Sequence, residues 1–570
     1  MIRNRRTMRR IENMLVILAI IFLCLEGWWL LNRAHRNGVT VTSLLPFQQH
    51  KRPNIDVPIE IAKKMQRSKE LQWLERTIDL DQAQILDYLQ GTPVILNETD
   101  AFGFRKKFDV VSTWNRVHRY AQQQEFTGYR YEYTLEVEIE DRKETFTQLR
   151  ANFLWMTRRI RANTIAYLLL HDNRNLQQKL VSSKNQQKLQ QELQSVVAKF
   201  SDLYYWYKDR SKTIRVMHDR FLNVTGTDKE SGIVMSGGAN QFRSLVLTIR
   251  ALREIMKCTL PIEVHYAGDS DLPMHLVEEL KKLPGVDIVD LKQSMPYEMR
   301  VIRGWSVKPF AILNSSFRKV IFIDADVLFF QDPAVILTKS PIFRQYGQLF
   351  FSDRSLDRGN GTYTEWFNEI NPYRTQYASG LRFANALSWH EMESGVVALD
   401  KGNVRILHAL YYACKMNAKD IRDETYTRVW GDKETFWLSF ELLRVPYVFV
   451  PTYSGAIGYK DGAKVCGNNY HVDETFKPFW WNSGIMMTKN ATKSNDMYMR
   501  FEYAAYDSDR DTLKWEWEHN GTPFCVEPLY PEREVIALDK QQKDIGAAYI
   551  RLDKEIKALY PEPKDEDNEL

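Results

Sequence analysis

The sequence shows no strong excess of charge of either sign and no glycine-rich nucleotide fingerprint. It has 570 residues, and its formal net charge at pH 7 is only +5. Because lysine and arginine are spread among acidic residues along the chain, this balance does not indicate a nucleic-acid partner. No GxGxxG or P-loop segment follows an expected strand, which argues against a dinucleotide-dependent dehydrogenase or a P-loop NTPase.

Cysteine is scarce. The five cysteines are Cys24, Cys258, Cys414, Cys466 and Cys525. None belongs to a CxxC pair, which argues against a zinc ribbon or a redox motif. Cys24 lies in an apolar segment, and the other four could form two disulfides in an oxidising compartment, with three connectivities open.

A long hydrophobic run occupies residues 14–31 and is about long enough to cross a bilayer as a helix. Five arginines precede this run, against Arg33 and Arg36 just after it. The positive-inside rule therefore predicts a cytoplasmic N-terminus and a lumenal remainder. A cleaved signal peptide is the alternative, but no small-residue cleavage site follows the run. We expect an uncleaved signal anchor and a type II single-pass topology.

Six triplets fit the acceptor pattern for N-glycosylation, which agrees with a lumenal body. Their asparagines are Asn97, Asn223, Asn314, Asn360, Asn490 and Asn520. Asn314 falls in an expected buried helix, so we expect it to remain unmodified.

Composition and patterning divide the chain into successive regions. Residues 32–55 are polar and irregular, residues 56–210 have helical patterning, and short strand-like runs begin near residue 213. The predicted regions are a cytoplasmic tail at 1–13, the transmembrane helix at 14–31, a stem at 32–55, a helical accessory region at 56–210, a catalytic domain at 211–560 and an acidic tail at 561–570.

Strand-like and helix-like patterns alternate through the first part of the catalytic region. Strands are expected at 232–236, 262–267, 286–291 and 319–324, and helices at 241–257, 274–282 and 307–316. This βαβ rhythm predicts an α/β fold with a mainly parallel, twisted sheet that is flanked by helices. A ligand of such a sheet binds outside the carboxyl ends of the strands.

The central motif is Asp324-Ala325-Asp326, which follows a buried type of strand. In an extended segment, residues two apart point to the same side, so Asp324 and Asp326 are expected to face one site. Two adjacent carboxylates repel each other, and a divalent cation relieves that repulsion. Such a cation can bridge a nucleotide diphosphate and stabilise it as a leaving group. The motif therefore predicts a metal-dependent transferase that uses a nucleotide sugar.

Further blocks accompany this motif. They are Gly304-Trp-Ser-Val-Lys-Pro-Phe-Ala311, Glu393-Ser-Gly-Val-Val-Ala-Leu-Asp400, Trp430-Gly-Asp-Lys-Glu-Thr-Phe-Trp437 and Lys477-Pro-Phe-Trp-Trp-Asn-Ser-Gly484. With them, roughly residues 230–500 resemble the GT-A nucleotide-diphospho-sugar transferases, and in detail the fungal Golgi α-1,3-mannosyltransferase family. The resemblance implies a type II Golgi membrane enzyme that transfers mannose from GDP-mannose to protein-linked glycans, with retention and with Mn²⁺.

A second resemblance concerns the run from His471 to Trp480, which is similar to a segment of glycogenin-like retaining transferases. It implies that His471 is a third metal ligand beside Asp324 and Asp326, and that Lys477 contacts the diphosphate. Imidazole with carboxylates suits manganese, and an ammonium group suits phosphate. This chain has one extra residue between Pro478 and Trp480.

Other carboxylates are candidates for catalysis or donor binding. Asp432 and Glu434 precede an amphipathic helix, where acidic groups also serve as simple caps. Either of them, or Glu393 at the start of an expected strand, could act on the acceptor hydroxyl or stabilise positive charge on the sugar. Asp269 follows the second strand and is a candidate for contact with the nucleotide. The sequence leaves the choice among these open.

Three functions compete. The first is an α-1,3-mannosyltransferase, the second is α-1,2 transfer by a relative with the same blocks, and the third is a non-catalytic glycan-binding or scaffolding relative. The expected partners are GDP-mannose, mannosylated glycoprotein acceptors and the membrane through one N-terminal helix. Other Golgi transferases or a second copy of this chain are further candidate partners. No nucleic acid is expected.

Overall fold

The computed structural model describes residues 142–171, 184–198, 204, 209–295, 304–354, 362–371, 374–487, 498–507, 514–516, 523–528 and 530–561. These residues all lie in one of the two units into which the chain divides, Arg67–Leu570. The predicted anchor at 14–31 and the stem at 32–55 lie outside them. Within the described ranges, no helix is both long and apolar enough to cross a membrane.

The predicted alternation of strands and helices is confirmed. The elements are β1 (Ser231–Ser236), α9 (Phe242–Glu254), β2 (Ile262–Tyr266), α10 (Met274–Lys281), β3 (Val286–Asp290), α13 (Val307–Asn314) and β4 (Lys319–Ile323). The strands β3, β2, β1 and β4 lie side by side in that order, and each pair is parallel. Helical connections of this kind bring the carboxyl ends of β1 to β4 to one edge.

Beyond β4 the sheet changes character, so the prediction of a mainly parallel sheet is wrong. The further strands are β5 (Leu328–Phe329), β6 (Gln348–Ser352), β7 (Met392–Asp400), β8 (Phe449–Asp461), β9 (Lys464–Val472), β10 (Pro478–Trp481), β11 (Tyr503–Asp507), β12 (Lys514–Glu516), β13 (Cys525–Glu527) and β14 (Val535–Ala537). β7 pairs antiparallel with both β4 and β6, and β8 pairs antiparallel with β9. The sheet is therefore mixed. Helices also separate β6, β7 and β8 along the chain, and β6 pairs parallel with β8, so both kinds of pairing occur beyond β4.

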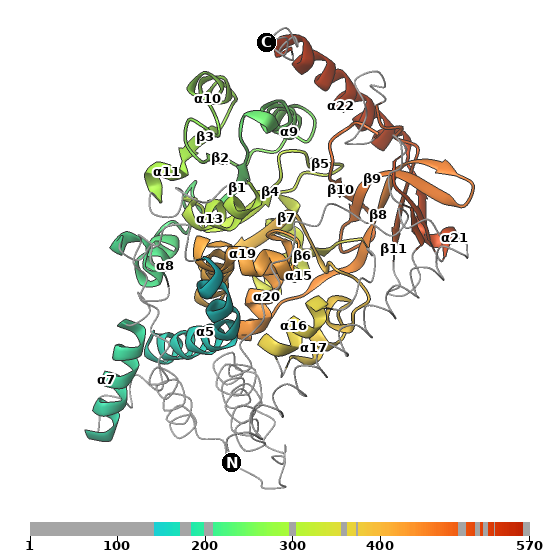
Figure 1. Ribbon diagram of the computed structural model, residues 1–570. Helices are drawn as coiled ribbons and strands as arrows, with labels where there is room; N and C mark the ends of the chain where they lie inside the picture. Colours follow the sequence, from blue (N-terminus) through green and yellow to red (C-terminus); the bar gives the residue numbers. More distant parts are fainter. Residues whose placement is uncertain are drawn as a thin grey trace, which may run out of the picture. The chain divides into compact units, whose positions relative to one another are not determined.

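Side chains of the central strands alternate between two hydrophobic cores. In β4, Val320 and Phe322 belong to one core, and Ile321 and Ile323 belong to the other. The same alternation runs through β7, because successive strand residues point to opposite faces. Helices cover both faces, which makes a three-layer α/β/α arrangement (Figure 1).

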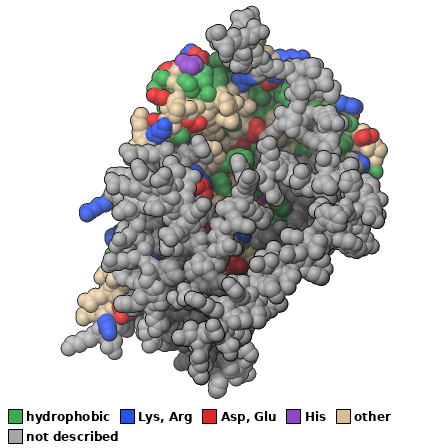
Figure 2. Space-filling view, viewed as in Figure 1, with side chains coloured by type: hydrophobic (Ala, Val, Ile, Leu, Met, Phe, Trp, Pro, Cys, Tyr) green, Lys and Arg blue, Asp and Glu red, His purple; other side chains and the backbone are tan. Residues whose placement is uncertain are grey.

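The helices fall into two groups according to the core they cover. α9 and α10 pack with α22 (Lys540–Leu559), and their contacts include the rings of Phe242 and Tyr560 at 5.1 Å. The opposite core receives α5 (Arg142–His171), α8 (Ile214–Asn223), α13, α16 (Thr362–Ile370), α18 (Val404–Asn417), α19 (Lys419–Arg428) and α20 (Lys433–Leu443). On the face shown in Figure 2, hydrophobic, acidic and basic side chains are interspersed over the described surface.

The helix α5 lies in the predicted accessory region, yet it contributes to the core of the catalytic region. Its Arg161 is only 1% exposed, and it donates hydrogen bonds to the Leu442 carbonyl at the end of α20 and, at 3.3 Å, to Asn371 Oδ1. The next helix, α7 (Lys184–Ala198), packs on α5 and buries Leu189 and Leu193. In the described part of the accessory region, these two helices therefore extend the core of the sheet.

Asn314 is buried at the end of α13, as expected. Its amide nitrogen donates to Ser294 Oγ at 3.1 Å, and its oxygen accepts from Lys212 Nζ at 2.9 Å. Of the other sequon asparagines, Asn223 is exposed at the end of α8, and the remaining four lie outside the described residues.

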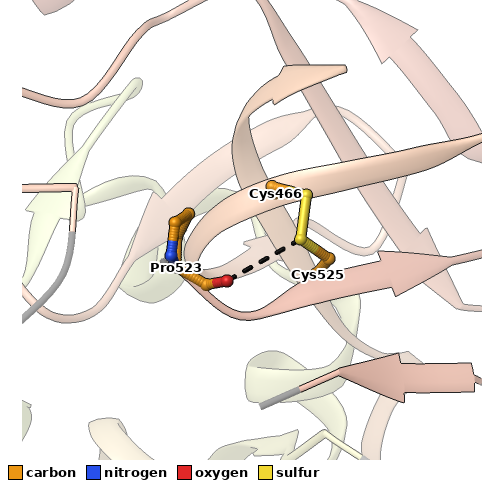
Figure 3. Close-up of a disulfide and its surroundings, with 3 residues drawn as sticks. All are labelled: Cys466, Pro523 and Cys525. Carbon is orange, nitrogen blue, oxygen red and sulfur yellow. Dashed lines mark hydrogen bonds between the residues drawn. A yellow bond between two sulfur atoms is a disulfide. The ribbon is translucent and has the colours of Figure 1, made fainter. Parts of the chain in front are cut away.

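One of the predicted disulfides is present. Cys466 on β9 and Cys525 on β13 are direct cross-strand partners, with their Cα atoms 4.0 Å apart (Figure 3). The bond closes a loop over a sequence separation of 59 residues. Cys258 and Cys414 are buried free thiols, so the described residues contain one disulfide instead of two.

We expect the Cys466–Cys525 disulfide to stabilise the antiparallel part of the sheet. The double variant Cys466→Ser, Cys525→Ser should lose about 2–4 kcal/mol of unfolding free energy, because the closed loop restricts the unfolded chain. Urea denaturation with and without reductant measures this loss. Reductant should destabilise the wild-type protein and leave the double variant unchanged. Equal stability of the two proteins under oxidising conditions would contradict the expectation.

Candidate active site

The site begins at the carboxyl end of β4, where the acidic motif forms a turn. The strand ends at Ile323, and Val327 N donates to the Asp324 carbonyl at 3.2 Å. The expectation that Asp324 and Asp326 share one side of an extended strand is therefore wrong. The turn is held by Asp324 N, which donates to the Gly395 carbonyl on β7 at 2.9 Å, and by Thr248 Oγ1 of α9, which donates to the Ala325 carbonyl at 2.7 Å.

The two aspartates nevertheless lie close enough to interact. Burial raises the pKa of Asp324 to about 7, and the negative charge of Asp326 adds to this rise. The ammonium of Lys308 opposes it. A carboxyl group with such a pKa is only partly ionised at neutral pH, so a cation at this turn would compete with protons for Asp324.

Lys308 on α13 joins this turn to two other elements. Its Nζ donates to Asp324 Oδ2 at 2.8 Å and to Ser394 Oγ on β7 at 3.0 Å, and it lies 3.6 Å from Asp432 Oδ2. We call Lys308, Asp324, Ser394 and Asp432 the Lys308 cluster. Burial opposes the charge of the lysine, but Asp324 and Asp432 together raise the pKa of its ammonium above the usual value.

A second cluster surrounds Lys433, the first residue of α20. Its Nζ lies 2.8 Å from Asp353 Oδ2 at the end of β6 and 3.1 Å from Glu393 Oε2 on β7. Asn469 Nδ2 on β9 also donates to Glu393 Oε2, at 3.1 Å. We call Lys433, Asp353, Glu393 and Asn469 the Lys433 cluster. Burial would raise the pKa values of both carboxyls, but Lys433 holds each of them below its usual range.

The two clusters are joined through the chain itself. Glu393 and Ser394 are neighbours on β7, and Asp432 and Lys433 are neighbours at the start of α20. In each pair, one residue belongs to the Lys433 cluster and the other to the Lys308 cluster. A displacement of either segment must therefore disturb both clusters.

Glu434 has a different environment from its neighbour Asp432. It is fully buried and accepts from the backbone amides of Glu391 and Met392 at 3.0 and 3.3 Å. Its other oxygen accepts from the indole of Trp437. Burial raises the pKa of Glu434 to about 8. These contacts attach α20 to the beginning of β7.

His471 is not brought together with Asp324 and Asp326. It lies on β9, is 2% exposed, and stacks on Trp480 with ring centroids 3.9 Å apart. Burial lowers its pKa to about 4, and its nearest charged groups include Glu393 and Asp353. In the described ranges, no three His, Cys, Asp or Glu side chains converge as metal ligands. A three-residue manganese site with His471 therefore does not fit this geometry.

Lys477 and Asp269, the remaining predicted contacts of the donor, are both exposed. Lys477 lies on the turn between β9 and β10, where its backbone amide donates to Asp473 Oδ1 at 3.1 Å. Asp269 follows β2, at the same edge of the sheet as Asp324. Their roles stay predictions.

Sequence reasoning missed both lysines at the centres of the clusters. Lys308 lies inside the block Gly304–Ala311, and a lysine in the apolar helix Val307–Asn314 is itself a signal of a buried charge. Such a residue must find buried acceptors. Lys433 directly follows Asp432, one of the candidate catalytic carboxylates. Asp353 and Asn469 carried no local signal, because only the pairing of distant strands brings them to the site.

Comparisons with known proteins show what the chain is similar to. Residues 230–476 match the family model "Mannosyltransferase putative", and both clusters lie within that range. "Putative alpha-1,3-mannosyltransferase MNN14" of Candida albicans is 28% identical over 52% of this chain and 49% of that protein. "Alpha-1,2-mannosyltransferase MNN24" of the same organism is 22% identical over 58% of this chain and 50% of that protein. The chain thus spans about half the length of these curated relatives.

Among solved structures, the galactosyltransferase LgtC in complex with donor and acceptor sugar analogues is similar over 37% of this chain and 70% of that chain. Its sequence identity is 14% and the TM-score is 0.25.

We expect a large loss of stability when the positive charge of Lys433 is removed from the Lys433 cluster. Lys433→Met removes the main counter-charge of the buried Asp353 and Glu393, which should cost about 3 kcal/mol or more at pH 7. Because Lys433 lowers the pKa values of both carboxyls, the loss should shrink as pH falls and they become protonated. Urea denaturation from pH 4 to 8 measures this. The exposed Lys281, which pairs with Glu278 at 2.8 Å, supplies the control Lys281→Met, with an expected change of less than about 0.5 kcal/mol. A similar small effect for both variants would contradict this account.

For Asp324, we expect the opposite effect: removal of its charge should stabilise the protein at high pH. A carboxyl whose pKa rises from 3.8 to about 7 on folding favours the folded state when protonated, and this contribution is lost as pH rises through about 7. Asp324→Asn should therefore unfold at the same or a higher denaturant concentration than wild type at pH 8, by on the order of 1 kcal/mol. At pH 4 this advantage should disappear. As a control, Asp400→Asn removes the partner of Arg318 at 2.9 Å and should destabilise at pH 8. Destabilisation of both variants at pH 8 would refute the raised pKa.

Proposed function

We propose that this chain, whose residues 230–476 match the family model "Mannosyltransferase putative", is a glycosyltransferase that transfers mannose from GDP-mannose to a mannosylated glycan. We further propose an α-1,3 linkage formed with retention. The observation that supports this proposal is the coincidence of the family match with both charged clusters at the junction of β4, β7 and α20.

The donor is assigned to the carboxyl ends of the parallel strands. Ligands of α/β sheets bind outside these ends, and β1, β2 and β4 all point their carboxyl ends to one edge. Asp269 after β2 and Asp324 after β4 lie on this edge and are our candidates for contact with the nucleotide sugar. Lys477, on the exposed β9–β10 turn, is the candidate for contact with the diphosphate.

The proposed cation site has two protein ligands instead of the three that the sequence suggested. Asp324 and Asp326 would hold Mn²⁺ without His471. The ring of His471 is stacked on Trp480, and the charges that act on it are those of the Lys433 cluster. When bound, a divalent cation supplies charge neutralisation for the departing diphosphate. Lys308 keeps its own contact with Asp324, which orients that carboxylate.

Among the three candidate catalytic carboxylates, we favour Asp432. Glu434 is held by two backbone amides and an indole, and Glu393 is held by Lys433 and Asn469. Asp432 Oδ2 accepts no hydrogen bond within the described residues, and its charged partner Lys308 lies at the longer distance of 3.6 Å. Burial raises the pKa of Asp432, which suits a group that accepts a proton from the acceptor hydroxyl.

The cellular setting is also a proposal. The predicted signal anchor at 14–31 supports a type II protein of the Golgi membrane with its catalytic domain in the lumen. The Cys466–Cys525 disulfide agrees with an oxidising compartment. Mannosylated glycoproteins are the proposed acceptors. Association with other Golgi transferases or with a second copy remains a prediction from the sequence alone.

A different linkage is the second candidate. The similarity to a protein named as an alpha-1,2-mannosyltransferase supports α-1,2 transfer by the same site. A non-catalytic glycan-binding role would leave unexplained why the chain keeps buried charged groups at the end of β4, since such groups are costly.

The enzyme assay tests donor, metal and linkage together. We expect the full-length protein in detergent to transfer mannose from GDP-mannose to α-mannoside acceptors, to lose activity with EDTA, and to regain it with Mn²⁺. Asp326→Asn and Asp432→Asn should each lower kcat about 100-fold or more, while Lys281→Met should not. Linkage analysis of the product identifies α-1,3 or α-1,2 transfer.

The assay can also refute the proposal. Transfer of a different sugar from a panel of nucleotide sugars would reject the donor, and full activity of Asp326→Asn would remove the acidic motif from the mechanism. Activity that persists without any divalent cation would reject the cation site.

A further inference from the structure

Two tryptophans beside the Lys308 cluster are unusually exposed. Trp305 and Trp430 are each 55% exposed, although a tryptophan side chain gains more from burial than almost any other. Trp305 belongs to a short 3₁₀ turn, Gly304–Ser306, directly before α13, and Trp430 lies two residues before Asp432, the N-cap of α20. Their ring centroids are 6.4 Å apart, with an interplanar angle of 41°. We call the pair the tryptophan platform.

The backbone of Gly431 fixes the position of the platform beside the site. Gly431, which follows Trp430, has a φ of +67°, a conformation that favours glycine. A Cβ atom at this position would lie 2.8 Å from Cε3 of Trp305. The indole of Trp305 therefore packs directly on the Gly431 backbone, and any side chain there would displace it. Trp430 is held by an edge contact with the ring of His390, at 6.2 Å and 84°.

The platform adjoins the groups assigned to chemistry. Trp305 lies three residues before Lys308, and Trp430 lies two residues before Asp432. Lys308 and Asp432 are themselves 3.6 Å apart. Two buried polar atoms near the platform, His390 Nδ1 and Asp432 Oδ2, have no hydrogen-bond partner within the described part of the chain. Buried polar atoms of this kind normally have a partner, so a ligand with hydroxyl groups would satisfy them.

We propose that the tryptophan platform binds a pyranose ring of the acceptor glycan. This inference rests on the proposed function, to which it adds the acceptor subsite. The aliphatic C–H face of a pyranose is apolar and carries slight positive charge, so it complements the negative face of an indole ring. Two tilted indoles offer two such faces, which suits an oligosaccharide more than a single sugar. The hydroxyl to be mannosylated then lies beside Asp432.

The guanine base of the donor is the competing occupant, because bases also stack on indoles. The sheet favours the glycan. β1 and β2, whose carboxyl ends are expected to receive the nucleotide, lie on one side of β4, and β7 lies on the other. α20, which begins next to the platform, is attached to β7 through Glu434. Trp430 is thus tied to the β7 side of the acidic turn, and Trp305 precedes α13, which packs on β1 but reaches β7 through Lys308 and Ser394.

Steady-state kinetics of the full-length enzyme test this assignment. Trp305→Ala and Trp430→Ala should each raise the KM for a mannotriose acceptor about tenfold, with the KM for GDP-mannose unchanged. Trp305→Phe and Trp430→Phe should recover part of the loss, because they restore an aromatic face. Leu222→Ala, which shortens a side chain that is 44% exposed on α8, is the control and should change neither KM. Thermal unfolding verifies that each variant is folded.

The outcomes separate the platform from the proposed function. An unchanged acceptor KM in both alanine variants would overturn the platform, and a raised KM for GDP-mannose would assign it to the base instead. Affinity electrophoresis through a gel that contains mannan reports binding without turnover. If the wild-type protein transfers no sugar but is retarded by mannan, and the alanine variants are not, the platform stands and the proposed function fails. If wild type and variants migrate alike, the platform is rejected.

Discussion

The buried ammonium of Lys308 is the contact on which the arrangement of the site depends. Asp324 follows β4, Asp432 precedes α20 and Ser394 lies on β7, and all three meet at this one nitrogen. Without it, the half-buried carboxyl group of Asp324 and the buried one of Asp432 would repel each other. The lysine therefore allows acidic groups from distant segments to share one site. Lys433 does the same for Asp353 and Glu393.

The change from parallel to antiparallel pairing is what brings these segments together. β7 runs antiparallel to β4, with Ile323 opposite Val396, so the beginning of β7 meets the end of β4. β6 also ends there, with Ser352 opposite Met392. If β7 were parallel to β4, Asp400 would stand at this edge and Glu393 would lie at the far end. The mixed sheet is thus a requirement of the site.

Local patterns in the sequence predicted the elements from β1 to β4 to within about three residues, because helix and strand periodicity is a short-range property. They also located the acidic motif. They did not reveal that Asp324 leaves the strand and enters a turn, since the turn is held by Gly395 and Thr248, which are distant in sequence. His471 shows the same limit. Its likeness to a metal ligand is local, but its burial against Trp480 depends on the pairing of β9 with β10.

The segment from Trp430 to Lys433 links binding to chemistry over four residues. Trp430 belongs to the platform, Asp432 to the Lys308 cluster and Lys433 to the Lys433 cluster. Gly431 fixes the backbone between them in a conformation that other residues adopt at a cost. A glycan that moved Trp430 would therefore move Asp432 with it. Since Asp432 is paired with Lys308, and Lys433 is paired with Asp353 and Glu393, the segment has little freedom to adjust. An acceptor ring must fit the platform as it stands, and this requirement makes the platform a source of acceptor specificity.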